Sequence, residues 1–199
     1  MQRTEKYYEA DAFRREATGR ILAVEPGKTG GKLALDGTVF YPEGGGQPAD
    51  RGTLTLADGT VLHVTDVHES EGVIWHTVDA LPAGAVPGAE AAESIDWEWR
   101  FDKMQQHTGE HILSGVIHRR FGYENVGFHM GADFVTIDLS GMLTPEQVNA
   151  YAGLLAAPWD ELNERILRDM VRRIVKAGGV TATAEWQSYR AQALGEEFC

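Results

Sequence analysis

Cysteine and long apolar runs are the two features that this sequence most clearly lacks. Cys199 is the only cysteine among 199 residues, so the chain forms no internal disulfide and shows no adaptation to an oxidising compartment. No apolar run approaches the roughly 18 residues of a membrane-spanning helix. The polar start, residues 1–6, is not followed by the apolar core of a secretory signal. We therefore expect a cytoplasmic protein with no membrane partner.

Positive charge is also scarce. Lysine and arginine number 18 against 30 acidic residues, which gives a formal net charge of −12. This balance argues against a protein that coats nucleic acid through bulk electrostatics, although it leaves room for a local basic patch. A hydrophobic content of 43%, with five tryptophans and six tyrosines, argues against disorder. The chain should fold around a sizeable core.

Short β-prone segments separated by turn residues occupy residues 20–80. Asp36-Gly37 and Asp58-Gly59 each stand between such segments, and Asp-Gly is a strong hairpin signal. Apolar and polar residues alternate in residues 53–56, 61–65 and 73–78. Five or six short strands at this spacing predict a small antiparallel barrel or sandwich.

A composition change follows the predicted strands. Residues 80–92 are rich in alanine, glycine and proline, and are interpreted either as a linker or as a turn into one more strand. We place a domain boundary near the end of this stretch. The predicted domains are residues 1–92, which are barrel-like, and residues 93–199.

Two histidines four residues apart mark the start of the second domain. His107 and His111 would lie on one face of a helix, where both imidazoles can reach a single metal ion. Glu110 lies on the same side and could orient a ligand, act as a base, or face solvent. The alternative is a pair of ordinary surface histidines. Alone, the pair is half a metal site.

Local signals place the neighbouring elements. Asp102 is the expected N-cap of the histidine helix, and its expected apolar anchors are Met104, Ile112, Val116 and Phe121. Residues 128–131 and 134–139 are predicted to form a hairpin. Thr144 and Gln147 have the spacing of a capping box at the start of a further helix.

Three motifs together resemble the alanyl-tRNA editing family, which includes the AlaX-like proteins and the editing domain of alanyl-tRNA synthetase. Residues 40–52, Phe-Tyr-Pro-Glu-Gly-Gly-Gly-Gln-Pro-Ala-Asp-Arg-Gly, resemble its glycine motif. Residues 106–111, Gln-His-Thr-Gly-Glu-His, resemble its first zinc half-site, and residues 127–139 resemble the hairpin that comes next. Their order makes the match more specific than any one motif, and it extends roughly over residues 18–170.

The resemblance implies an α+β fold, with a small N-terminal antiparallel β-barrel-like domain followed by an α/β editing domain with a histidine-bearing helix. It implies hydrolysis of the ester of mischarged tRNA for alanine, carrying serine or glycine. Zn²⁺ bound by His107 and His111 would activate water or hold the ester carbonyl. Selecting serine over alanine requires polar groups that need the extra hydroxyl. Thr108, Glu110 and His129 are the candidates.

The glycine loop and the arginines have more than one interpretation. Gly44, Gly45, Gly46 and Gln47 do not form a P-loop, because no Gly-Lys-Ser/Thr follows. The loop is either a simple bend or a segment that contacts the tRNA end or docks the domains. Arg119, Arg120, Arg165 and Arg168 are candidate tRNA contacts, or else a solvated charged face.

The sequence departs from the family pattern in one respect. Family members carry two further zinc ligands, a cysteine and a histidine four residues apart, well downstream of the first pair. We expect the zinc site to be incomplete in this chain, the editing domain to be truncated at its C-terminus, and Cys199 to be a candidate substitute ligand.

Two alternative functions stay open from the sequence. One is a non-catalytic, truncated editing module that binds tRNA without turnover. The other is a zinc peptidase of the H-x-x-E-H class, in which Glu110 is the general base and a carboxylate such as Glu185 is the third ligand. The peptidase interpretation gives no account of residues 40–52.

Overall fold

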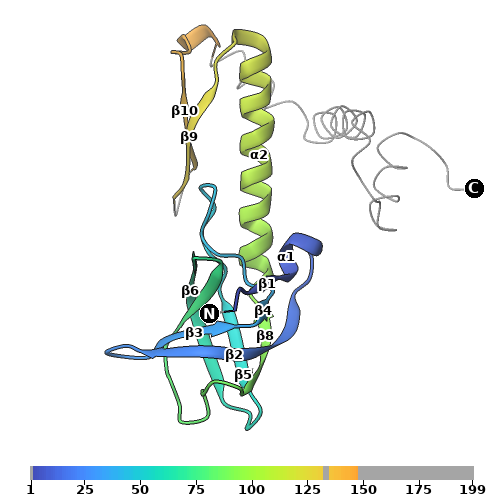
Figure 1. The fold of residues 1–199 in the computed structure, drawn as a ribbon. Helices are drawn as coiled ribbons and strands as arrows, with labels where there is room; N and C mark the ends of the chain where they lie inside the picture. The colour runs from blue at the N-terminus through green and yellow to red at the C-terminus, as the bar shows by residue number, and fades with distance from the viewer. Residues whose placement is uncertain (1, 132–134, 148–199) are drawn as a thin grey trace, which may run out of the picture. The chain divides into compact units, whose positions relative to one another are not determined.

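The computed structural model describes residues 2–131 and 135–147. The chain forms two compact units, Met1–Ser140 and Gly141–Cys199. Every element labelled in Figure 1 belongs to the first unit. Within the described residues, no helix has both the length and the apolar character needed to cross a bilayer.

A closed six-stranded barrel forms the lower half of the first unit (Figure 1). Its strands pair in the order β2-β3-β7-β6-β5-β8, and every pair is antiparallel. They are β2 Glu16–Pro26, β3 Gly31–Leu35, β5 Gly52–Leu56, β6 Val61–Ser70, β7 Val73–Val78 and β8 Glu90–Ile95. The predicted antiparallel barrel and the α+β fold class are confirmed.

The barrel core follows from the alternation in the strands. In β8, for example, Ala91, Glu93 and Ile95 are buried while the residues between them are exposed. Apolar side chains from several strands and from the segment after β4 (Gly37–Thr38) fill the interior, among them Ile21, Leu33, Leu35, Phe40, Leu54, Leu62 and Ile74. Closure also pairs every strand edge of the barrel, which satisfies the backbone groups there.

The two Asp-Gly dipeptides behave differently. Asp58-Gly59 reverses the chain between β5 and β6, as predicted, with Gly59 at φ +84° and the Asp58 carboxylate accepting from the Thr60 amide at 2.9 Å. The hairpin predicted at Asp36-Gly37 is wrong. Gly37 begins β4, which pairs in parallel with β1 (Glu5–Lys6).

Close packing explains the position of the first Asp-Gly. The Asp36 carboxylate accepts from the Arg20 amide at 2.7 Å. A Cβ at Gly37 would collide with the ring and hydroxyl of Tyr7, the first residue of the short helix α1 (Tyr7–Ala10). The glycine therefore permits the approach of the N-terminal segment instead of a chain reversal.

The alanine- and proline-rich stretch leads into one more strand. β8 occupies its end and closes the barrel, so the barrel extends to Ile95. The domain boundary predicted at residue 92 falls within this strand, and the division into residues 1–92 and 93–199 stays a prediction.

Helix α2 runs from Trp97 to Phe121. Its N-cap is Asp96, whose carboxylate accepts from the Trp99 amide at 3.1 Å. The prediction of Asp102 as the cap was wrong: this residue lies in the second turn, with its carboxylate 2.7 Å from Lys103 Nζ. Gly122 caps the C-terminal end of the helix with φ +72°, and its amide donates to the His118 carbonyl.

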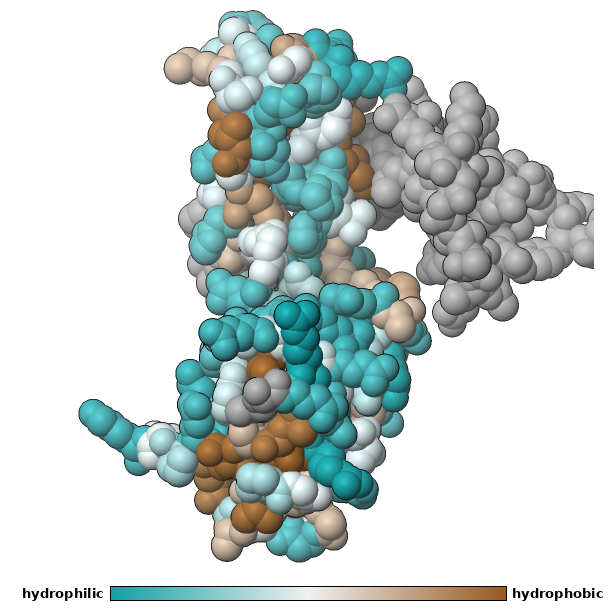
Figure 2. All heavy atoms as spheres, in the orientation of Figure 1, coloured by the Kyte–Doolittle hydropathy of each residue, from teal (hydrophilic) through white to brown (hydrophobic). Residues whose placement is uncertain are grey.

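The residues that α2 buries are mostly polar. They are Arg100, Lys103, Glu110 and Ile117. Three of the predicted apolar anchors, Met104, Ile112 and Phe121, are only half-buried, and the fourth, Val116, is exposed. On the face drawn in Figure 2, hydrophobic side chains accordingly gather over the barrel, and hydrophilic side chains follow most of the helix. Polar contacts therefore contribute to the docking of α2.

The segment after α2 confirms two local predictions. Strands β9 (Asn125–Met130) and β10 (Val135–Leu139) pair as an antiparallel hairpin, with Phe128 opposite Ile137. In the second unit, the Thr144 amide donates to the Gln147 side chain at 2.7 Å. The Gln147 amide donates to the Thr144 hydroxyl at 3.3 Å, which completes a capping box.

Candidate functional site

The structure brings His107, Glu110 and His111 together on α2. One potential ligand atom from each lies within 4.8 Å of the others. The two imidazole rings stack, with centroids 4.8 Å apart and planes inclined by 27°. One helical turn between the histidines produces this arrangement, because side chains at i and i+4 lie one above the other.

Three groups surround the His107 ring. His111 stacks on the ring from the next turn, and Phe128 of β9 stacks on it with a centroid distance of 5.2 Å. Its Nδ1 lies 2.9 Å from Oε1 of Gln47, which comes from the loop between β4 and β5. Burial, and then the neighbouring His111, lower the pKa of His107 below its ordinary value of 6.5.

Glu110 contacts His111 rather than solvent. Its side chain is only 1% exposed, and Oε2 lies 3.2 Å from Nδ1 of His111. The other carboxylate oxygen accepts from the Ser114 hydroxyl and the Asn125 amide. Of the three sequence interpretations, this excludes the solvent-facing carboxylate. The contact with His111 is the one expected of a residue that orients a ligand.

The two histidines fit a zinc site. An acceptor oxygen lies near Nδ1 of each ring: Oε1 of Gln47 is 2.9 Å from Nδ1 of His107, and Oε2 of Glu110 is 3.2 Å from Nδ1 of His111. In a neutral imidazole whose hydrogen is on Nδ1, the lone pair is on Nε2. Metal-binding histidines in proteins usually have such an acceptor at the second nitrogen. Zinc sites take three or four protein ligands. Among the described residues, this cluster supplies two imidazole nitrogens, since the Glu110 oxygens are engaged elsewhere.

The glycine loop is both a tight turn and a docking segment. Gly44 and Gln47 form an antiparallel bridge around Gly45 and Gly46, which have φ +60° and +80°. A Cβ at Gly46 would collide with Phe128 of β9, so only glycine permits this approach. The loop therefore joins the barrel to the hairpin. Its contact with tRNA stays a prediction.

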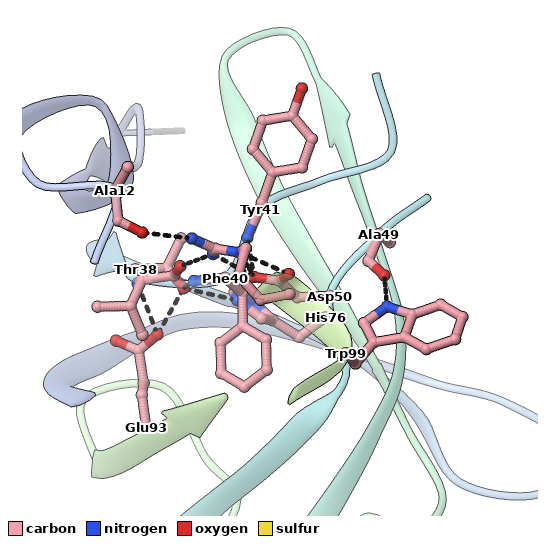
Figure 3. Close-up of polar contacts among 11 residues, drawn as sticks. Ala12, Thr38, Phe40, Tyr41, Ala49, Asp50, His76, Glu93 and Trp99 are labelled. Carbon is pink, nitrogen blue, oxygen red and sulfur yellow. Dashed lines mark hydrogen bonds and ion pairs between the residues drawn. The ribbon is translucent and has the colours of Figure 1, made fainter. Parts of the chain in front are cut away.

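A buried ion pair follows the glycine loop (Figure 3). Asp50 and Arg100 are 1% and 2% exposed, and two guanidinium nitrogens donate to the carboxylate. Arg100 also donates to the Val39 carbonyl at 2.7 Å. Nearby, Trp99 Nε1 donates to the Ala49 carbonyl at 2.9 Å. These contacts fix the first turn of α2 on the barrel.

Sequence reasoning missed this ion pair and the neighbours of the histidines. Asp50 and Arg100 are 50 residues apart, and Gln47 and His107 are 60 apart. Opposite charges at such separations carry no local signal. Phe128 lay within a recognised motif, but nothing in the pattern indicated that its ring stacks on His107.

The remaining predicted site residues lie around the cluster. Thr108 is exposed, and its hydroxyl donates to the Met104 carbonyl at 2.8 Å. His129 is exposed on β9, opposite Thr136. Arg119 and Arg120 are exposed in the last turn of α2. Four predicted residues lie outside the described residues: Arg165, Arg168, Glu185 and Cys199.

Comparisons with known proteins identify the family to which the sequence belongs. A family model of class II (A) tRNA synthetases matches residues 10–99. The chain is 39% identical over 139 residues to the alanyl-tRNA editing protein AlaX-L of Pyrococcus horikoshii, covering 69% of this chain and 34% of the relative. It is 38% identical over 152 residues to AlaX-M of the same organism, covering 74% and 64%. The chain belongs to the alanyl-tRNA editing family.

A segment of an alanine-tRNA ligase also matches this chain. An alanine-tRNA ligase of Pyrobaculum neutrophilum is 40% identical over 122 residues, which are 61% of this chain and 13% of the ligase. The chain spans about a third of AlaX-L and about two thirds of AlaX-M. Membership of the editing family, predicted from three motifs, is confirmed.

Proposed function

We propose that this protein is an editing hydrolase that removes a wrong amino acid, serine or glycine, from mischarged tRNA for alanine. The observation that carries the proposal is the pair formed by His107 and His111, which lie together on α2, each with a side-chain oxygen within 3.2 Å of Nδ1. The names of the relatives supply the substrate class.

The residues divide the work between them. Zn²⁺, when bound, would supply Lewis-acid chemistry at the ester, and His107 and His111 would hold it together with ligands from elsewhere. Glu110 orients His111 from a buried position. Thr108 uses its hydroxyl hydrogen on the Met104 carbonyl, so its oxygen is left to accept from the hydroxyl of a seryl group.

This use of Thr108 gives the site a basis for selecting serine over alanine. Alanine has no hydroxyl to offer, so it would not form this hydrogen bond. His129, exposed on β9, is the other candidate for a contact with the amino acid. Arg119 and Arg120 are the proposed phosphate contacts, acting locally in a chain whose net charge is −12.

Release of serine from Ser-tRNA for alanine tests the proposal. The 199-residue chain should hydrolyse the ester with added zinc and leave Ala-tRNA intact. A His107→Ala, His111→Ala variant should lose the activity, whereas His63→Ala, which removes an exposed histidine of β6, should retain it. Hydrolysis that survives in the double variant would contradict the metal assignment. If no condition gives hydrolysis, the proposed hydrolase activity is contradicted.

The non-catalytic alternative has one observation in its favour. Among the described residues, the cluster has three candidate ligands, and one of them, Glu110, already accepts hydrogen bonds from Ser114 and Asn125. The two imidazoles alone are one ligand fewer than a catalytic zinc site uses. A module of that kind would bind tRNA and never release serine. The peptidase alternative is disfavoured, because both oxygens of Glu110 are engaged and the carboxylate is buried, whereas a general base must reach a water molecule.

A further inference from the structure

We propose that Gln47 is a positioning residue of the editing site, whose side-chain amide fixes the tautomer and the ring orientation of His107. Gln47 belongs to the barrel loop and His107 to helix α2, so the inference assigns to the barrel a part in preparing the metal ligand. It deepens the proposed function and rests on it for the purpose of the site.

Because Gln47 is buried, its side-chain amide needs a hydrogen-bond partner within the protein. The residue is only 6% exposed, although glutamine is usually found at the surface. A buried amide that lacks a partner is unfavourable, and Oε1 of Gln47 lies 2.9 Å from Nδ1 of His107. The same contact therefore satisfies the amide oxygen and holds the imidazole.

The chemistry of the contact determines the tautomer. A neutral imidazole carries one hydrogen, on either Nδ1 or Nε2, and its other nitrogen has the lone pair. An amide oxygen can only accept. Facing Nδ1, it selects the ring that carries hydrogen there, and Nε2 is then the nitrogen available to a metal ion. Without this acceptor, both tautomers of His107 are accessible.

The loop that carries Gln47 is itself held in place. The Gln47 amide donates to the Gly44 carbonyl at 3.0 Å, and the Gly44 amide donates to the Gln47 carbonyl at 3.1 Å. Gly46 packs against Phe128, whose ring stacks on His107. The loop thus reaches the imidazole by two routes, through the amide of Gln47 at its edge and through Phe128 on its face.

Nitrogen-15 NMR of the histidine rings at pH 8, where a free imidazole is neutral, tests the tautomer without metal or substrate. In the wild-type chain, His107 should have its hydrogen on Nδ1. Gln47→Met keeps the length of the side chain but removes the acceptor, so the Nε2–H form should appear. Gln47→Glu keeps an acceptor and should retain the wild-type tautomer.

The matched control is Gln105→Met, which changes an exposed glutamine of α2 and should leave the His107 signals unchanged. A wild-type His107 with its hydrogen on Nε2, or an unchanged tautomer in Gln47→Met, would overturn the inference. Should Gln47→Met fail to fold, the wild-type and Gln47→Glu spectra still decide it, since both require the Nδ1–H form.

Zinc affinity, measured by competition with a chromophoric chelator, gives the second readout. Loss of an outer contact to a metal-bound histidine weakens binding by about 10 to 100-fold, so Gln47→Met should show that loss and Gln47→Glu should not. Equal affinity in the wild type and Gln47→Met would overturn the positioning role. A wild-type chain that binds no zinc would instead count against the proposed function, and the NMR experiment would still decide the role of Gln47.

Discussion

Glu93 occupies an unusual position for a carboxyl group, inside the barrel and 2% exposed (Figure 3). Its Oε2 accepts from the Val39 amide at 3.1 Å and contacts the Thr38 hydroxyl, which also lies 2.9 Å from Nε2 of His76. Within the described residues, Oε1 has no hydrogen-bond partner. Burial raises the pKa of Glu93 to about 7 and lowers that of His76 to about 4.

The hydrogen bonds among Glu93, Thr38 and His76 support uncharged forms of Glu93 and His76 near pH 6. Nδ1 of His76 faces the Leu33 carbonyl at 3.2 Å, so Nδ1 carries the hydrogen of the neutral ring and Nε2 has the lone pair. Thr38 then has one hydroxyl hydrogen for two neighbours, Glu93 and His76. A proton on the Glu93 carboxyl completes the set, which agrees with the direction of its pKa.

The two groups give opposite dependences of stability on pH. The folded pKa of Glu93 lies above its ordinary 4.5, so its contribution is present below pH 4.5 and is lost as the pH rises to about 7. The folded pKa of His76 lies below its ordinary 6.5, so its contribution is present above pH 6.5 and is lost as the pH falls to about 4. Between these ordinary values the two slopes oppose each other.

Glu93→Gln should therefore change the shape of the pH profile. Of the two opposing dependences the variant keeps only that of His76, so its free energy of unfolding should no longer fall as the pH rises from 4.5 to about 7. Relative to the wild type it should gain about 3 kcal/mol between pH 4.5 and 7.5. Urea unfolding at several pH values measures this, with Glu90→Gln on the exposed face of β8 as control. Parallel profiles for Glu93→Gln and the wild type would refute it.

The N-cap of helix α2 is Asp96, six residues before the cap predicted from the sequence, Asp102. Asp96→Ala removes the carboxylate that accepts from the Trp99 amide and should lower the free energy of unfolding by about 1 kcal/mol. Asp102→Ala removes a half-exposed partner of the buried Lys103, whose ammonium also lies over the Trp99 ring at 4.4 Å, and it leaves the cap intact, so it should cost less than Asp96→Ala. Denaturant unfolding measures the free energy of unfolding of both variants. An equal decrease in the two would be inconsistent with Asp96 as the cap.

The two aspartates also show where sequence reasoning stops. Residues 97–101 precede the predicted cap at Asp102, so the sequence interpretation placed them before the helix. In the structure they belong to its first turns, where Trp99 bonds to Ala49 and Arg100 bonds to Asp50. Tertiary contacts therefore determine where helix α2 begins. By contrast, the capping box at Thr144 and Gln147 is a local pattern, and it was predictable.

The same division applies to the candidate site. The spacing of His107 and His111 places both on one helix face whatever the rest of the chain does, so the pair could be found from the sequence. Their orienting partners could not. Gln47 reaches His107 across 60 residues of chain, and only the closed barrel and its loop determine that approach.

For the whole first unit, the Asp50–Arg100 pair is the main polar connection between the barrel and α2. Asp50→Asn should leave Arg100 buried without a counter-charge and lower the free energy of unfolding by about 3 to 5 kcal/mol. Asp66→Asn, an exposed change on β6, is the control. Guanidinium unfolding followed by tryptophan fluorescence measures both, and a loss below about 1 kcal/mol for Asp50→Asn would contradict the assigned role.

Because of the glycine loop, the histidine site could not be grafted into another protein as helix α2 and the hairpin alone. A fragment of α2 and the β9–β10 hairpin would carry both histidines and Glu110 into a new scaffold, but Gln47 would stay behind. His107 would then lose the acceptor at Nδ1, which is one of the three groups that surround its ring. An engineer who grafts this site must therefore bring residues 44–47 along with the helix, or redesign a substitute for them.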